Sequence, residues 1–242
     1  MPIKKLLIII PVYDEEKTLG ISVPKLVELF KKNPFPKVNV QIAIAGRQST
    51  DNTNAIATKL EKKYANVFFS KIDYPTKCGR IAKINLNTDY DFYAFIDADL
   101  PVDLKKFHEI IQAVVTDKAD LGIASRYIPG AGQNRDPRRV FFSKAFNLLL
   151  RILLPKIKTH DSQAGAKAWN KKVAKEVIPK IDTTSYFFDA ELLYFCFDQK
   201  LKVVEIPVHY EDMRNDSKIN VLHDSWVMGK EMLMFSLKRR LS

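Results

Sequence analysis

FYAFIDADLPVD, residues 92–103, begins as an apolar run and ends with three acids in seven residues. Residues 92–96 predict a buried strand. Because ionised carboxylates are costly to bury, we expect Asp97, Asp99 and Asp103 to lie beyond the carboxyl end of that strand, facing a crevice. Open α/β sheets bind their ligands at this position. The stretch therefore predicts an α/β sheet with a ligand site at the end of this strand.

Strands and helices alternate on both sides of this stretch. Before it, the hydrophobic pattern predicts strands at 5–12, 38–45 and 67–70 and helices at 18–32, 53–64 and 81–87. After it, the pattern predicts a helix from 103 to about 116, a strand at 121–124, a helix at 143–154, a strand at 203–208 and a helix from 222 to the C-terminus. This alternation favours a mostly parallel twisted sheet with right-handed crossovers and flanking helices.

Composition predicts one domain, residues 1–220, followed by a basic amphipathic helix, residues 221–242. The 46% hydrophobic content of the 242 residues is enough for a sizeable core. The formal charge of +11 favours an anionic partner such as nucleic acid, phospholipid headgroups or phosphorylated metabolites, without choosing among them. We expect no nucleic-acid binding, because the basic residues are dispersed and form no recognition motif. Cys78 and Cys196 lack metal-ligand spacing, which argues against a disulfide framework or a zinc site and fits a reducing cytoplasm.

Any membrane contact is expected to be peripheral. The apolar run at residues 6–10 is too short for a signal peptide and leads into Pro11, so it predicts a first buried strand. No segment approaches the roughly 20 apolar residues that span a bilayer. The amphipathic stretches 143–158 and 222–237 have two interpretations, either surface helices on an anionic membrane or ordinary helices that face the core.

Asp97 and Asp99 form the clearest candidate for chemistry. Two carboxylates separated by one residue at a strand end can converge on Mg²⁺ or Mn²⁺, which also binds the phosphates of a substrate. The alternative is a solvated acidic turn, the usual explanation of an isolated Asp-x-Asp, but the preceding strand favours the metal. Asp189 and Glu191 follow an aromatic patch, so each is either an acid aimed at the site or a helix-start acid.

The segment 125–139 carries Gly, Pro and four arginines, which is typical of a mobile functional loop. The four histidines show no ligand spacing and predict structural or surface roles. A Ser-His-Asp constellation, a Walker loop and a dinucleotide glycine fingerprint are absent from the sequence. Hydrolase and NAD-dependent functions therefore lack support.

Together these segments resemble the inverting glycosyltransferases of the GT-A fold, and within them the dolichyl-phosphate mannose synthase and polyprenyl-phosphate glycosyltransferase group. The resemblance covers nearly the whole chain and lies in the order of its motifs. They are Ile10-Pro-Val-Tyr-Asp-Glu-Glu16, Ser49-Thr-Asp-Asn-Thr53, Asp97-Ala-Asp-Leu100, Ser125-Arg-Tyr-Ile-Pro-Gly130, Arg139 with Ser143, Asp161-Ser-Gln-Ala-Gly165, Phe188-Asp-Ala-Glu-Leu192, and Glu205-Ile-Pro-Val208 followed by Arg214 and Ser217-Lys218.

The resemblance implies a Rossmann-like GT-A sheet and a metal-dependent, inverting transfer of sugar. The implied donor is a GDP- or UDP-linked sugar, the acceptor is a polyprenyl (dolichyl-type) phosphate, and the location is the cytoplasmic face of the membrane. The implied ligands of Mg²⁺ or Mn²⁺ are Asp97 and Asp99, of which Asp99 is also counted as catalytic. The nucleotide sugar would contact Pro11, Tyr13, Glu15, Asp51 and Asp97, and the diphosphate and acceptor phosphate would contact Arg126, Arg139, Ser143, Arg214 and Lys218.

Two segments depart from the family pattern. Gly46-Arg47-Gln48 stands where relatives commonly carry an acid that helps to hold the base and ribose. Pro101 stands where some mannose synthases place a metal-binding glutamine, a role that Asp103 or water could take. Two alternatives stay open. One is a transferase with a soluble sugar or protein hydroxyl as acceptor and Asp189 or Glu191 as base, and the other is a non-catalytic binding protein of the same fold.

Overall fold

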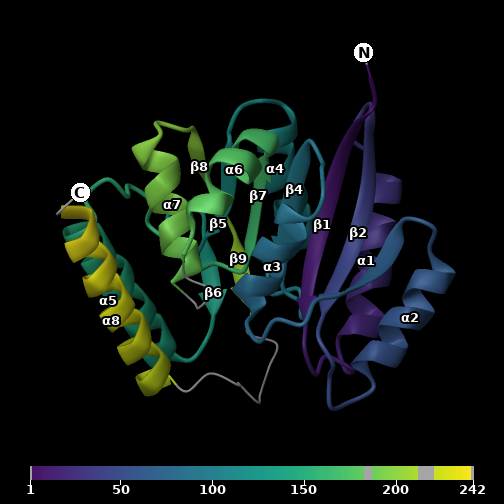
Figure 1. Ribbon diagram of the computed structural model, residues 1–242, viewed down its shortest axis with the longest axis horizontal. Coiled ribbons are helices and arrows are strands. Elements are labelled where there is room, and N and C mark those ends of the chain that lie inside the picture. Colours follow the sequence, from purple (N-terminus) through teal and green to yellow (C-terminus); the bar gives the residue numbers. More distant parts are fainter. Residues whose placement is uncertain (1, 183–186, 212–220, 241–242) are drawn as a thin grey trace.

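Four parallel strands form one half of the main sheet (Figure 1). They are β1 (Lys4–Val12), β2 (Val38–Gly46), β3 (Val67–Lys71) and β4 (Phe92–Ile96), in the spatial order β3-β2-β1-β4. Ile8 of β1 lies between Ile42 of β2 and Ala94 of β4. The computed structural model describes residues 2–182, 187–211 and 221–240, with the backbone alone for residues 221–226 and 240.

The other half of the sheet contains an antiparallel strand that the sequence pattern did not predict. β7 (Ala166–Asn170) pairs antiparallel with β4 on one edge and with β5 (Leu121–Ser125) on the other. β8 (Val203–Pro207) then runs parallel to β5. β7 was missed because its five residues, AKAWN, include a lysine and form no apolar run. The prediction of a mostly parallel sheet is confirmed.

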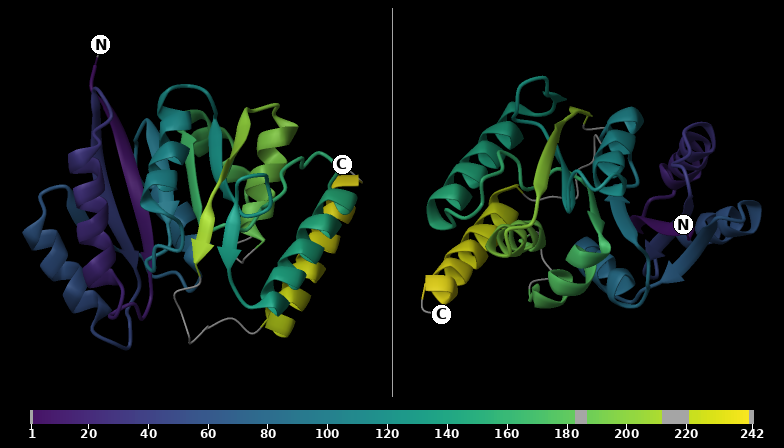
Figure 2. Two further views of the ribbon diagram at one scale, coloured as in Figure 1. Left: turned by 180° about the vertical axis from the view of Figure 1, so that it is seen from behind. Right: turned by 90° about the horizontal axis from the view of Figure 1, so that it is seen from above.

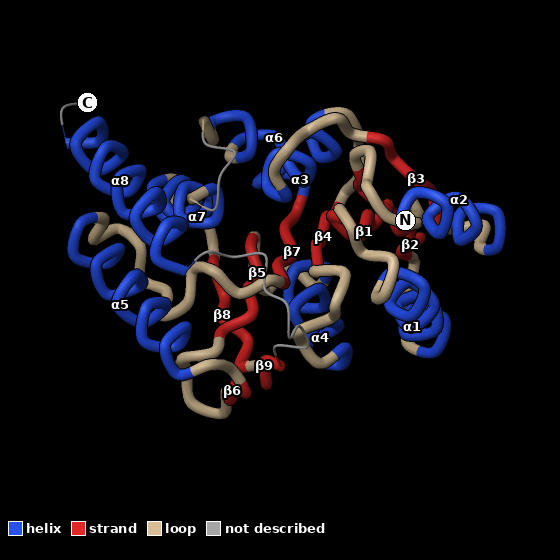
Figure 3. Tube along the Cα trace, turned by 90° about the horizontal axis from the view of Figure 1, so that it is seen from below, coloured by secondary structure: helices blue, strands red, loops and turns tan. Residues whose placement is uncertain are grey.

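Both faces of the sheet are covered by helices (Figures 2 and 3). Leu6, Ile8 and Ile10 of β1 pack in a core shared with α1 (Leu19–Lys32), α2 (Thr53–Lys63) and α4 (Leu104–Val115). Leu7 and Ile9 enter a second core with α3 (Lys77–Leu86), α6 (Lys171–Glu176) and α7 (Phe188–Asp198). A short 3-10 turn, Ile178–Lys180, follows α6. This two-sided burial explains why the first strand is apolar at successive positions rather than alternating.

Two long helices lie side by side at the end of the molecule away from β3 (Figure 1). They are α5 (Pro137–Leu153) and α8 (Val221–Arg240), so the predicted C-terminal helix forms, whereas its basic amphipathic character stays a prediction. Phe146 and Leu150 of α5 share a core with Met232 and Phe235 of α8. Among the described residues, no helix has both the length and the hydropathy needed to cross a membrane.

Two helices begin earlier than the hydrophobic pattern indicated. α3 starts at Lys77 rather than at residue 81, because the Thr76 side chain accepts a hydrogen bond from the Gly79 N–H (3.1 Å) and caps the helix. α5 starts at Pro137 rather than at residue 143, because Asp136 accepts from the Arg138 N–H (2.7 Å) and proline suits the first helical position. The arginine-rich segment is also only partly a loop, since β6 (Gly132–Asn134) pairs in parallel with β9 (His209–Glu211).

Asp103 caps α4, and its removal should destabilise the fold. Its Oδ1 accepts hydrogen bonds from the backbone N–H groups of Lys105 (2.8 Å) and Lys106 (3.1 Å). We therefore expect Asp103→Ala to lower the free energy of unfolding by about 1 kcal/mol in urea titrations, and Asp103→Asn to retain most of the stability. Because the carboxylate serves the helix, Mn²⁺ affinity should not change. An unaltered unfolding midpoint combined with weaker Mn²⁺ binding would make Asp103 a metal ligand instead.

Candidate functional site

Asp97 lies where the strand order of the sheet reverses. It follows β4 directly, while the chain crosses from β1 to β2 on the opposite side. Its N–H donates to the carbonyl of Gly165 (3.2 Å), and a Cβ at Gly165 would stand 2.2 Å from the Asp97 Oδ2. Only glycine therefore lets the chain entering β7 pass this close to the carboxylate. The position is the expected ligand crevice of an open α/β sheet.

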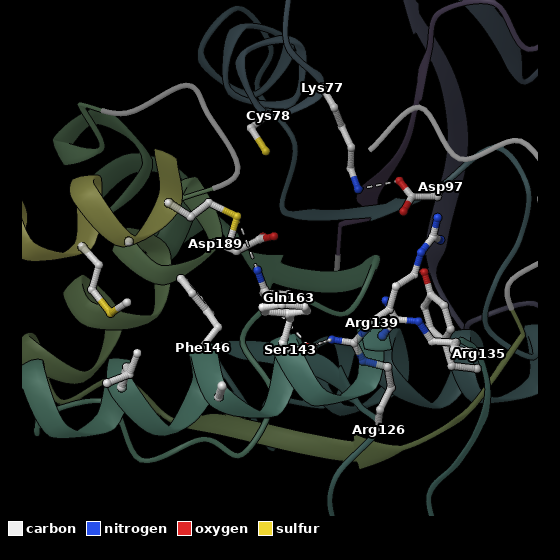
Figure 4. Close-up of a pocket in the computed structure, with 17 residues that line it drawn as sticks. Lys77, Cys78, Asp97, Arg126, Arg135, Arg139, Ser143, Phe146, Gln163 and Asp189 are labelled. Carbon is white, nitrogen blue, oxygen red and sulfur yellow. Dashed lines mark hydrogen bonds and ion pairs between the residues drawn. The ribbon is translucent and has the colours of Figure 1, made fainter. Parts of the chain in front are cut away.

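A cavity of about 320 Å³ opens beside Asp97 (Figure 4). Its lining comes from α3, the residues directly after β4 and β5, the segment before α5, α5 itself, the chain before β7, α7, β9 and α8. One part of the lining is charged and the other is apolar. The charged part holds Lys77, Asp97, Arg126, Arg135, Arg139 and Asp189, and the apolar part holds Phe142, Phe146, Leu149, Met228 and Met232.

Arg126 is a buried guanidinium that donates two hydrogen bonds to one carboxylate. Its Nε and Nη2 donate to the Asp161 oxygens at 2.6 and 2.8 Å, and Nη2 also donates to Ser143 Oγ (3.3 Å). Burial alone would lower the pKa of Arg126, but the Asp161 carboxylate outweighs it and the pKa is raised. Burial likewise acts to raise the pKa of Asp161, and Arg126 reverses this, leaving the pKa lowered. Both groups are therefore charged, and Arg126 is held rigidly at the cavity wall.

Tyr210 joins the arginines to the acids at the end of β4. The Arg126 and Arg135 guanidinium carbons each lie 5.2 Å from the centre of its ring. Burial, followed by the charges of Asp97 and Asp99, raises the pKa of Tyr210 to about 12, against the opposing effect of Arg126. The ring is therefore neutral near pH 7 and lies against both guanidinium groups in the cavity lining.

The structure separates the two acids of α7. Asp189 lines the cavity, and its Oδ1 lies 3.0 Å from the Nζ of the fully buried Lys167. Lys167 also donates to the Ala164 carbonyl (2.9 Å). Glu191 is buried and accepts a hydrogen bond from the Asp182 N–H (2.9 Å), and it is not among the residues that line the cavity. Of the two candidate bases, only Asp189 faces the space where a substrate fits.

The loops after β1 and β2 carry three of the predicted nucleotide contacts, Tyr13, Glu15 and Asp51. Pro11 is part of β1, and the Arg47 guanidinium stacks 4.0 Å from the centre of the Tyr13 ring. The Glu15 N–H donates to Thr53 Oγ1 (2.6 Å), and Asp51 accepts from the Glu16 N–H (3.1 Å). These two hydrogen bonds tie the loops together at the edge of the crevice, outside the cavity lining described above.

Comparisons with known proteins agree with this geometry. The chain matches glycosyl transferase family 2 over residues 7–178. The chain belongs to that family. The family and the enzyme class expected from the sequence, a glycosyltransferase, are thus confirmed.

Among its relatives, the polyprenol monophosphomannose synthase of Mycolicibacterium smegmatis is 27% identical, over 87% of this chain and 79% of that protein. Glycosyltransferase AglD of Haloferax volcanii is 24% identical over 93% of this chain, which spans 36% of that longer protein. Human dolichyl-phosphate beta-glucosyltransferase is 22% identical over 98% of this chain and 76% of that protein.

Solved structures confirm the GT-A fold. Glucosyl-3-phosphoglycerate synthase of Mycobacterium tuberculosis, solved with Mn²⁺, UDP and phosphoglyceric acid, superposes with a TM-score of 0.69. The superposition covers 98% of this chain and 78% of that chain at 17% sequence identity. At this identity the likeness establishes the arrangement of the elements alone.

A divalent metal fits the acids at the end of β4. The Oδ1 of Asp97 already pairs with a cation, since the Lys77 Nζ lies 2.6 Å away. Its Oδ2 lies beside Gly165, which has no side chain to cover it. Carboxylate oxygens are the ligands that Mg²⁺ and Mn²⁺ prefer. The described residues contain no group of three or more His, Cys, Asp or Glu side chains suited to a metal. The remaining ligands would therefore come from a bound substrate and from water.

Several site residues were not found from the sequence. Lys77 and Lys167 were missed together with the start of α3 and the strand β7, which place them, and Asp161 was noted in a motif without a role. The Thr76 cap, three residues before Gly79, was a signal that could have revealed Lys77. Two expected phosphate contacts, Arg214 and Lys218, lie outside the described residues.

The buried ion pair of Arg126 and Asp161 should dominate the stability of the cavity wall. We expect Asp161→Asn to lower the free energy of unfolding by about 3–5 kcal/mol, because it leaves a buried guanidinium without its counter-charge. Asp198→Asn is the matched control, since Asp198 pairs with Lys156 at an exposed position. That change should cost less than about 1 kcal/mol. Equal, small losses in urea unfolding of the two variants would contradict the assignment.

Proposed function

We propose that the chain transfers a sugar from a nucleoside-diphosphate sugar to a polyprenyl phosphate, with inversion at the anomeric carbon. The observation that carries the proposal is the two-part cavity, which sets three arginines against an apolar lining from α5 and α8. A phosphate joined to a hydrocarbon chain matches both parts, since planar guanidinium groups suit phosphate oxygens and the isoprene units would cover apolar side chains. A soluble acceptor would leave the apolar part unused.

The acceptor chemistry needs little from the protein beyond position and charge. An ionised phosphate oxygen forms a bond to the anomeric carbon while the bond from that carbon to the diphosphate breaks, and the nucleoside diphosphate leaves. Because the nucleophile already carries its negative charge, the step requires no general base. Arg126 and Arg139 would hold the acceptor phosphate, with Ser143 beside them. Asp189, 3.0 Å from Lys167, would help to fix the cavity wall.

The donor would occupy the crevice between the β1 and β4 ends. Asp97 and Asp99 would hold Mg²⁺ or Mn²⁺, which, when bound, neutralises charge that builds up on the leaving diphosphate. Tyr13, Glu15 and Asp51 would face the nucleoside, with Pro11 beneath them. Relatives named as a polyprenol monophosphomannose synthase and as dolichyl-phosphate beta-glucosyltransferases support the acceptor, and solved structures with UDP and Mn²⁺ support the donor and the metal.

The outer faces of α5 and α8 fit a membrane surface. Phe141, Leu148 and Ile152 of α5 are 68%, 53% and 61% exposed, and their spacing of seven and four residues places them on one stripe. α8 adds the exposed Leu233, Met234 and Leu237. Exposed basic side chains lie on the same helices, among them Arg138, Lys144, Lys230 and Lys238. An apolar stripe with neighbouring cations is suited to the anionic cytoplasmic face of a bilayer, from which a polyprenyl phosphate could enter the cavity.

Donor binding should depend on the metal and on Asp99. In calorimetric titrations we expect either GDP or UDP to bind only with Mn²⁺, and Asp99→Ala to weaken that binding at least about tenfold, because one hard carboxylate ligand is lost. Asp73→Ala, on the loop after β3, is the control and should bind normally.

The chemical class of the acceptor that supports turnover distinguishes the candidate functions. We expect turnover with polyprenyl phosphate and none with polyprenol or a soluble sugar. Transfer to a hydroxyl group, lost in Asp189→Asn, would instead support the alternative with Asp189 as base. If neither nucleotide binds with Mn²⁺, the chain is a non-catalytic protein of this fold.

Membrane association should depend on the exposed stripe of α5. We expect the double variant Phe141→Ser with Ile152→Ser to bind vesicles containing anionic lipid at least about tenfold more weakly in sedimentation assays, since each buried apolar side chain is worth roughly 1.5–3 kcal/mol. Ile21→Ser is the matched control, because Ile21 is 58% exposed on α1, in the other half of the molecule. Equal vesicle binding by all three proteins would exclude this face.

A further inference from the structure

Lys77 forms an ion pair with Asp97, one of the two carboxylates that would bind a metal. Its Nζ lies 2.6 Å from Asp97 Oδ1, and Figure 4 shows the two side chains meeting at the wall of the cavity. The Lys77 side chain is 30% exposed, so an ammonium group with three donors also faces the cavity. The pair is not needed to satisfy a fully buried charge, in contrast to the pair of Arg126 and Asp161.

The backbone that carries Lys77 is fixed. Lys77 is the first residue of α3, whose start is capped by Thr76, and a Cβ at Gly79 would lie 2.1 Å from the ring of Tyr74. The loop before α3 is therefore packed onto the first turn of the helix. The long side chain of Lys77 can change partner while its backbone stays in place.

Two buried cations near Asp97, Lys167 behind the cavity wall and Arg126 in its lining, are held by other partners. Lys167 is fully buried and contacts Asp189 and the Ala164 carbonyl. Arg126 donates hydrogen bonds from Nε and Nη2 to the two carboxylate oxygens of Asp161. Asp97, by contrast, pairs with Lys77 through its Oδ1, and Figure 4 shows this contact at the cavity. Lys77 is thus the cation placed to respond when Asp97 acquires another ligand.

A metal ion and Lys77 cannot both use this oxygen without strong repulsion. Mg²⁺ binds oxygen ligands at about 2.0–2.1 Å, which would bring it close to an ammonium group that stays on the same oxygen. Like charges a few ångströms apart in a partly buried site repel each other strongly. A diphosphate arriving with the metal brings negative charge and offers the ammonium a new partner a short distance away.

We propose that Lys77 neutralises Asp97 in the free enzyme and moves onto the donor diphosphate when the metal takes Asp97. Lys77 is then a competitor of the metal in the absence of nucleotide and a ligand of the diphosphate in its presence. The metal alone binds weakly, and the metal and nucleotide strengthen each other's binding by the same factor. This inference rests on the proposed donor site and adds a residue that controls the order in which that site fills.

The test compares Lys77→Met with the wild type in two titrations, Mn²⁺ without nucleotide and the preferred nucleotide with saturating Mn²⁺. We expect Lys77→Met to bind free Mn²⁺ about tenfold more tightly and the nucleotide about tenfold more weakly, because a unit charge a few ångströms away is removed in each case. Lys77→Arg keeps the charge and should shift both affinities far less. Lys83→Met, an exposed lysine on the same helix, is the control and should match the wild type.

The outcomes separate the inference from the function on which it rests. If the wild type binds nucleotide with Mn²⁺ and Lys77→Met gives unchanged affinities, or weaker Mn²⁺ binding, the role of Lys77 is overturned while the donor site stands. If the wild type binds no nucleotide with Mn²⁺, both are overturned. Thermal unfolding of Lys77→Met shows whether the variant is folded, and Lys77→Gln replaces it in both titrations if it is not.

Discussion

The pairing of β4 on both of its edges is the constraint on which the site depends. β4 is buried along its whole length, runs parallel to β1 on one side and antiparallel to β7 on the other, and ends at Asp97. The parallel partner brings the β1 loop to the same edge of the sheet, and the antiparallel partner brings Gly165 against the Asp97 carboxylate. A single strand thus joins the β1 side of the crevice to the cavity side.

The ion pairs in and around the cavity differ in their exposure to solvent. Arg126 with Asp161 and Lys167 with Asp189 are buried pairs that hold the wall in one shape. Lys77 with Asp97 is a more exposed pair at the mouth of the crevice. Buried ion pairs add little net stability compared with apolar packing, but breaking one is costly, so the inner pairs fix the geometry while the outer pair can exchange partners.

Much of the fold and the acidic motif could be predicted from the sequence because local signals and burial agree there. The strand at 92–96 and the acids after it follow from an apolar run and from the cost of burying charge. β7 could not be predicted, because its lysine is balanced by Asp189, a partner distant in sequence. The first turn of α3 depends on a cap at Thr76 rather than on hydrophobic spacing, so the predicted helix began too late, at residue 81. Lys77 then fell outside it and was not recognised as a site residue. The roles of Pro11, Tyr13, Glu15 and Asp51 toward a nucleotide stay predictions.

The strand order also has a consequence for how the chain is made. β1 to β4 are complete once residue 96 has been synthesised, and they can pair with one another at once. β5, by contrast, pairs with β7 and β8, which come later in the chain. During synthesis β5 therefore has no strand to pair with until β7 has emerged from the ribosome. Such a strand is a natural target for chaperones on the nascent chain, and its late insertion, which also buries Lys167, would complete the sheet.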